Sequence, residues 1–154
     1  MEHSAAVAPR SDLNRLAISA TTHCLIGCAL GELTGMMIAT ALGWGAVASV
    51  ALAVGLAYLF GFSLTAMPLV RAGLTAGAVV STAVAADTVS ITIMELIDNV
   101  TVVLVPGAIE AGVDDPLLYA AIVAGFAIAY PFAFLVNRYM IARGKGCAHA
   151  HGHH

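Results

Sequence analysis

Four carboxylic acids lie within long apolar stretches of this sequence, where no lysine or arginine accompanies them. They are Glu32, Asp87, Glu95 and Asp98. The lipid interior holds no water to solvate a carboxylate, so such groups are rare there and face a bundle interior or a cavity. Each costs about 2.5–3.5 kcal/mol at the membrane centre on insertion scales. Four of them in one small chain indicate that bound protons or bound cations neutralise the charge.

Sulfur ligands accompany the first of these acids. Cys24, Cys28, Glu32 and Met36 recur every four residues, which places them on one face of a helix. Cysteine and methionine favour soft ions such as Cu(I), and cysteine also suits Zn(II). His23 points about 100° away from Cys24 around the helix axis and would join a site only from the side. This row predicts a transition-metal site, although the thiols are also compatible with ordinary packing, and Met36 by itself is expected to pack.

A row of glycines runs beside these residues. Gly27, Gly31 and Gly35 share the spacing of four. Small residues at this spacing let two helix backbones approach closely inside a membrane. We expect the glycine row to hold the polar face against a neighbouring helix, which belongs either to this chain or to a second subunit. On this basis a homo-oligomer is expected.

The other three acids share one apolar segment. On a helix, Asp87, Met94 and Asp98 fall on one face and Glu95 lies to its side. Glu95 and Asp98 are three residues apart and can share an ion, whereas Asp87 is about 16 Å from Asp98 along the axis. The segment therefore predicts two ion positions. The alternative is that each acid is protonated and hydrogen-bonded to a carbonyl or hydroxyl group.

The chain ends in a tract rich in histidine. It contains Cys147, His149, His151 and His153. Short tracts of this kind are typical of metal binding. A purification tag is the alternative, but tags are usually uninterrupted runs of histidine. The tract therefore predicts a native site that collects metal ions.

The composition places the chain among integral membrane proteins. Of its 154 residues, 60% are hydrophobic and 10% are charged, against about 45–50% and about 25% in soluble domains. About 20 apolar residues span a bilayer as a helix. Four segments qualify: about Leu16 to Leu42, about Ala46 to Met67 with an end at Pro68, one within Leu74 to Val105, and about Pro116 to Ile141. The third is longer than a span needs and is expected to tilt, extend or break near Asp87. No basic patch interleaved with aromatics indicates nucleic acid as a partner.

The basic residues indicate the orientation. They are Arg10, Arg15, Arg71, Arg138, Arg143 and Lys145. Four spans place all of them on one side, which is cytoplasmic by the positive-inside rule. The sequence thus predicts an all-α, integral membrane four-helix bundle in the cell inner (plasma) membrane. Its parts would be a cytoplasmic segment 1–15, a four-span domain 16–142 and a cytoplasmic tail 143–154, with both termini cytoplasmic.

The motifs together resemble a known family. They are His23-Cys24-x-x-Gly27-Cys28-x-x-Gly31-Glu32, Asp87-x-x-Ser90-Ile91-x-x-Met94-Glu95-x-x-Asp98-Asn99, Pro106-Gly107-Ala108, Asn137-Arg138 and Arg143-Gly144-Lys145-Gly146, followed by the His-rich end. This pattern is similar to a family of small four-helix prokaryotic membrane proteins catalogued as a domain of unknown function. The resemblance covers nearly all the chain after about residue 16. It implies a four-span fold and supplies no activity.

The residues favour binding and transport of a copper or zinc ion. In this hypothesis His23, Cys24 and Cys28 form the inner site, and Glu32, Glu95 and Asp98 the mid-membrane site, while Asp87 relays the ion or a proton. The exit of the transport pathway would face the acidic loop that contains Glu110, Asp114 and Asp115. One alternative is a membrane enzyme with a redox-active metal centre, although the Glu-x-x-His signature of such bundles is missing. Another is a proton or cation pathway without a specific metal.

Overall fold

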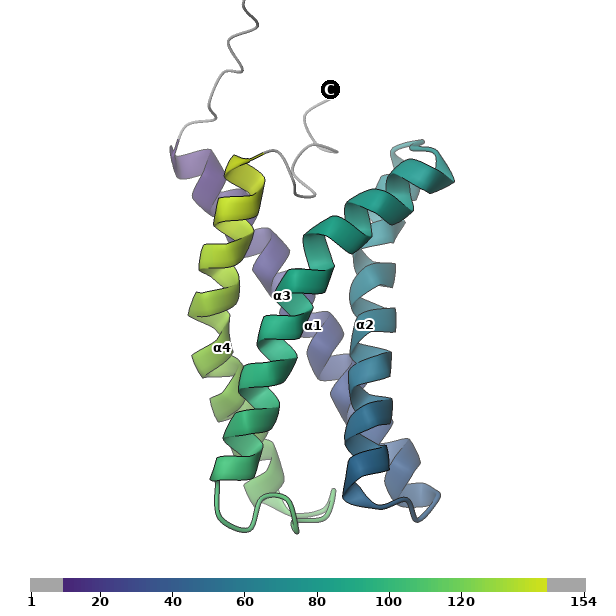
Figure 1. Cartoon of the computed structure of the whole chain (residues 1–154), viewed down its shortest axis with the longest axis vertical. Coiled ribbons are helices and arrows are strands. Elements are labelled where there is room, and N and C mark those ends of the chain that lie inside the picture. Colours follow the sequence, from purple (N-terminus) through teal and green to yellow (C-terminus); the bar gives the residue numbers. More distant parts are fainter. Residues whose placement is uncertain (1–9, 144–154) are drawn as a thin grey trace, which may run out of the picture.

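The structure is a computed structural model that describes residues 10–143. It contains α1 (Arg10–Ala41), α2 (Ala46–Arg71), α3 (Ala76–Leu104) and α4 (Pro116–Ala142). They run alternately up and down, so α1 and α3 point the same way (Figure 1). All four helices are long and apolar enough to cross a membrane. The predicted all-helical architecture and the number of apolar helices are therefore confirmed for the described residues.

Tight turns join the first three helices at glycines. Gly43 and Gly73 have φ of 68° and 80°, a left-handed conformation that glycine adopts without a steric penalty. After each, a backbone N–H reaches back to the preceding helix: Trp44 to the Ala39 carbonyl at 2.9 Å, and Leu74 to the Leu69 carbonyl at 3.2 Å. These contacts satisfy carbonyls that the helix ends leave without partners. They fix α1 against α2 and α2 against α3 as antiparallel neighbours.

Two of the predicted helix boundaries were wrong. The first helix begins at Arg10 rather than near Leu16. The second continues through Pro68 to Arg71. Proline removes a single backbone donor. The last turn of α2 still forms because the Ala72 N–H bonds to the carbonyls of Pro68 and Val70.

The long third segment forms one helix without a break. Its 29 residues run from Ala76 to Leu104, and Thr75 accepts a hydrogen bond from the Ala78 N–H at its start. Figure 1 shows that its N-terminal part leans towards α2 and then changes direction. The helix remains continuous at Asp87. Of the three expectations for this segment, the break near Asp87 is therefore wrong.

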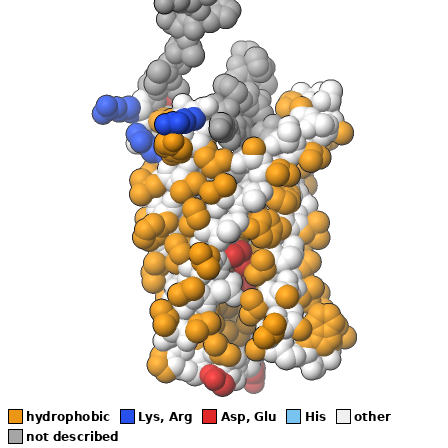
Figure 2. Space-filling model, in the orientation of Figure 1, with side chains coloured by type: hydrophobic (Ala, Val, Ile, Leu, Met, Phe, Trp, Pro, Cys, Tyr) orange, Lys and Arg blue, Asp and Glu red, His pale blue; other side chains and the backbone are white. Residues whose placement is uncertain are grey.

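Charge is divided between the two ends of the molecule. Arg10 and Arg15 lie in the first turns of α1, Arg71 ends α2, and Arg138 lies near the end of α4. Figure 2 shows basic side chains at this end, acidic side chains at the opposite end, and one acidic group visible at mid-height between the helices. Arg138 Nε donates to Asn14 Oδ1 at 2.7 Å and joins α4 to α1. The segregation agrees with the sequence pattern from which the orientation was predicted.

Candidate functional site

The glycine row of α1 packs against α2 of the same chain. A Cβ atom on Gly27, Gly31 or Gly35 would lie 2.7, 2.2 or 2.5 Å from the backbone of Gly61, Ala57 or Ala53. No real Cβ is accommodated at such distances, so only glycine allows this approach. The interface expected for these glycines therefore lies inside the chain. Because α2 covers the glycine row, the neighbouring face of α1, which carries Cys24, Cys28 and Glu32, is directed towards α3.

Six polar side chains of α1 and α3 face one another in the bundle. We call them the acid–thiol row, and they are Cys24, Cys28 and Glu32 from α1 and Asp87, Glu95 and Asp98 from α3. Each is at most 5% exposed. Because α1 and α3 run in parallel, the facing residues follow the same order along both helices. The row thus extends along the bundle axis.

The row is organised as three pairs. Cys24 Sγ lies 3.8 Å from Asp87 Oδ1 and donates to it. One turn further along α1, Cys28 lies beside Glu95, and beyond it Glu32 lies beside Asp98. Each pair takes one member from each helix. The sequence predicted two ion positions, whereas the structure contains three pairs. In each pair a thiol or carboxyl group of α1 lies beside a carboxyl group of α3.

The carboxyl groups lack the donors that buried acids usually have. Six buried oxygens accept no hydrogen bond in the part of the chain described: Glu32 Oε2, Asp87 Oδ2, both oxygens of Glu95 and both of Asp98. An unpaired buried polar group costs free energy comparable with a lost hydrogen bond, and an unpaired buried charge costs far more. The row therefore needs protons, or a cation, to be stable inside the bundle.

A hydrogen-bonded cluster lies near the Cys24–Asp87 pair, with Thr21 three residues before Cys24 and Ser90 three residues after Asp87. Asn137 of α4 donates through Nδ2 to Thr21 Oγ1 at 2.9 Å and to Ser90 Oγ at 3.1 Å. Thr21 in turn donates to the Ala17 carbonyl at 2.7 Å. All three polar side chains are buried. The cluster ties α1, α3 and α4 together.

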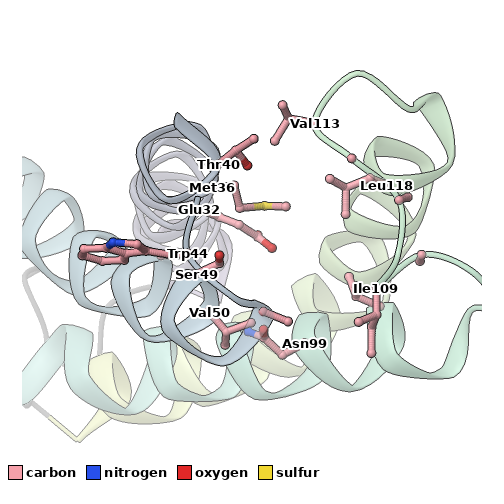
Figure 3. A pocket seen from close by; sticks show the side chains of 16 residues that line it. Glu32, Met36, Thr40, Trp44, Ser49, Val50, Asn99, Ile109, Val113 and Leu118 are labelled. Carbon is pink, nitrogen blue, oxygen red and sulfur yellow. The ribbon is translucent and has the colours of Figure 1, made fainter. Parts of the chain in front are cut away.

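A cavity lies at the other end of the row. It has a volume of about 210 Å³ and is lined by α1, α2, α3 and the loop before α4. Glu32, Met36, Thr40, Ser49 and Asn99 contribute polar or sulfur atoms to its wall. Figure 3 shows the Glu32 carboxyl group and the Met36 thioether pointing into the same space. Glu32 therefore belongs both to the acid–thiol row and to the cavity.

Not every predicted ligand joins the row. The His23 side chain is exposed, and its Nδ1 lies 2.8 Å from the Ser19 carbonyl of its own helix. Met94 is fully buried in the hydrophobic core that also contains Cys24 and Cys28. Cys147, His149, His151 and His153 lie outside the described residues. Within residues 10–143, no three side chains of His, Cys, Asp or Glu are arranged to hold a metal ion.

Sequence reasoning missed several residues of this site. Ser90 and Asn137 stand in the motifs quoted from the sequence and Thr21 in none of them, but no spacing within one helix could reveal that the three form a cluster. Gly125 of α4 was missed as well: a Cβ there would lie 2.2 Å from Asp98 Oδ1. Met36 packs against the hydrophobic core, as was expected of it by itself, and it also lines the cavity.

One comparison with known proteins gives a match. The family model described as "Domain of unknown function (DUF4396)" matches residues 14–146. No curated protein and no solved structure matches the chain. The match covers most of the sequence, so the resemblance to a family of unknown function is confirmed.

Proposed function

The chain belongs to the DUF4396 family, and since that family carries no known activity we propose a function from the residues themselves. The protein binds a positively charged ion within the bundle and moves it across the cell inner membrane, with both termini in the cytoplasm. A copper or zinc ion is the first candidate. The single observation that supports this most strongly is the acid–thiol row, whose four acids keep six buried oxygens without donors.

The chemistry of the row fits a metal ion that exchanges with protons. Thiols and carboxylic acids bind metals in their deprotonated forms, so uptake of a metal releases protons. Cys28 interacts through space with Glu32 and Glu95, and Glu32, Glu95 and Asp98 interact with one another. As they stand they form pairs, and an ion would have to draw two neighbouring pairs together to obtain three or four ligands. Asp87 with Cys24 would take the next position along the axis.

A second candidate is a proton pathway without a metal. The pairwise arrangement favours it, because two facing acidic groups can share one proton without further ligands. Purified protein in liposomes separates the two functions. Proton flux that is unaffected by a strong chelator favours the proton pathway, whereas flux that requires added copper or zinc favours metal transport.

Metal content tests the leading proposal directly. The double variant Cys24→Ala with Glu32→Gln removes ligands from two steps of the row while leaving the His-rich tail intact. We expect the purified full chain to lose the metal that is bound in the bundle and to keep any metal bound by the tail. The affinity of the bundle site for the metal should weaken by about tenfold or more. The measurement is elemental analysis after equilibration at fixed concentrations of free Cu(I) or Zn(II).

A control uses His23→Ala, since this imidazole is exposed and its Nδ1 lies 2.8 Å from the Ser19 carbonyl of its own helix. Its metal content should equal that of the wild type. If the double variant also retained the full metal content, the acid–thiol row would not be the binding site and the proposal would fail.

A further inference from the structure

The cavity beside Glu32 is built as a binding site and not only as a gap in packing. Glu32 is 5% exposed, its Oε2 accepts no hydrogen bond from any residue that the structure describes, and its carboxyl group points into the cavity (Figure 3). Among residues 10–143, no lysine, arginine or histidine lines the cavity. A buried carboxylate without a cationic neighbour attracts a cation from solution, because its charge is otherwise unpaired.

Sulfur in the wall indicates which class of cation fits. Met36 lies one turn from Glu32 on α1, and Figure 3 shows its thioether beside the carboxyl group. A thioether is a neutral, polarisable ligand that selects soft ions such as Cu(I) over ions that prefer oxygen. Next along the same face of α1 come Cys28 and Cys24. Sulfur ligands are therefore available both at the cavity and further along the row.

We propose that this cavity is an access site for a soft monovalent cation, Cu(I), which Met36 and Glu32 bind together. The inference rests on the proposed function and adds to it the place of access and the class of ion. Thr40, Ser49 and Asn99 provide oxygen atoms for water that still accompanies the ion. From the cavity the ion needs only to pass Glu32 to reach Asp98, which lies beside it.

The chain contains its own reporter for this site. Trp44 is its single tryptophan and lines the cavity. Ag(I) is a suitable probe, because it shares the sulfur preference of Cu(I) and does not change oxidation state in air. A soft, heavy ion bound beside an indole quenches its fluorescence. The experiment titrates the purified full chain in detergent with Ag(I), at free concentrations fixed by a chelator so that binding to the His-rich tail does not distort the curve.

We expect saturable quenching of Trp44 in the wild type and an apparent affinity at least about tenfold weaker in Met36→Leu and in Glu32→Gln. Met36→Leu keeps the side-chain volume, so the core should tolerate it. The matched control is Met37→Leu, since Met37 is the neighbouring residue and is 63% exposed on the outer surface of the helix. Its affinity should equal that of the wild type.

Absence of saturable quenching in the wild type would overturn the inference. Equal Ag(I) affinity in Met36→Leu and Met37→Leu would overturn it as well. Circular dichroism of each variant identifies any loss of fold. Tighter binding of Zn(II) than of Ag(I) at the cavity would also contradict it, because a thioether gives zinc little advantage.

A further variant separates this inference from the proposed function. Cys28→Ser removes a sulfur from the row and leaves the cavity unchanged. If the quenching survives in Cys28→Ser while total bound Ag(I) falls, both the access site and the row bind the ion. If the quenching survives and total Ag(I) is unchanged, the cavity binds a cation but the row does not, and only the proposed function fails.

Discussion

A single glycine determines where Asp98 can lie. Gly125 of α4 faces this acid, and a Cβ added there would lie 2.2 Å from Asp98 Oδ1 and 2.8 Å from its Cα. Contact with the backbone means that rotation of the side chain cannot relieve the overlap. Asp98 is fully buried. The absence of a side chain at residue 125 therefore makes room for the acid that pairs with Glu32.

Gly125→Ala should consequently destabilise the protein and displace Asp98. Overpacking of this kind costs typically about 1–3 kcal/mol, which we expect as a lower unfolding midpoint in detergent. The control is Gly55→Ala in α2, where a Cβ would meet nothing within 4 Å. That substitution should be neutral or stabilising, because alanine is the better helix former. Equal midpoints for both variants would contradict the packing of α4 against Asp98.

The sequence identified most of the acids and thiols of the site, but it did not identify which of them contact one another. The period of the helix placed Cys24, Cys28 and Glu32 on one face, and the structure agrees. It could not reveal that Glu32 meets Asp98, because no spacing within one helix determines its rotation against another. Met36 packs against the core as expected, but the sequence could not show that it also lines a cavity, since residues from several helices and the loop before α4 form that cavity together.

The parallel course of α1 and α3 creates the acid–thiol row. Both helices start at the end of the bundle that carries the arginines, so the order of ligands is the same on each. Cys24 contacts Asp87, and the next two pairs, Cys28 with Glu95 and Glu32 with Asp98, lie about one turn further along α3 than equal steps on both helices would place them. A shift of one turn would pair each acid with a different partner.

A disulfide tests this register. Asp87→Cys should form a disulfide with Cys24 on mild oxidation with diamide, because the two side chains already approach within 3.8 Å. Mass spectrometry of the digested protein identifies the linked peptides. The control is Val89→Cys, since Val89 is two residues away and 45% exposed on the outside of α3. Linkage of Cys24 to residue 89 instead of residue 87 would show that α3 is rotated.

The helices themselves were largely predictable from the sequence, because apolar segments of sufficient length leave few alternatives in a membrane. Their ends were less so. Pro68 was read as a terminator, although α2 needs only one further turn beyond it. The sequence left open whether the third helix continues past Asp87, because it does not show that Cys24 of another helix contacts this acid.

For the molecule as a whole, we expect the ends of α2 to lie on opposite sides of the membrane. Val47 near its start is 86% exposed, and Ala72 directly after its end is exposed as well. A membrane-impermeant thiol reagent applied to intact cells should label Val47→Cys and leave Ala72→Cys unlabelled until the cells are permeabilised. The wild type, whose Cys24 and Cys28 are buried, supplies the background. The reverse pattern would place the termini outside.

If the protein transports an ion as proposed, the hydrogen-bonded cluster of Thr21, Ser90 and Asn137 would limit the rate of transport. The amide of Asn137 has no proton to give up at ordinary pH, and the Thr21 hydroxyl already donates to a backbone carbonyl. Under the proposed function, a proton or metal ion that leaves the row through this cluster would meet side chains that are bonded to one another. Passage would then require α4 to separate from α1 and α3. A transporter built in this way would turn over like a carrier, one conformational cycle per ion, with saturating rates far below those of an open channel.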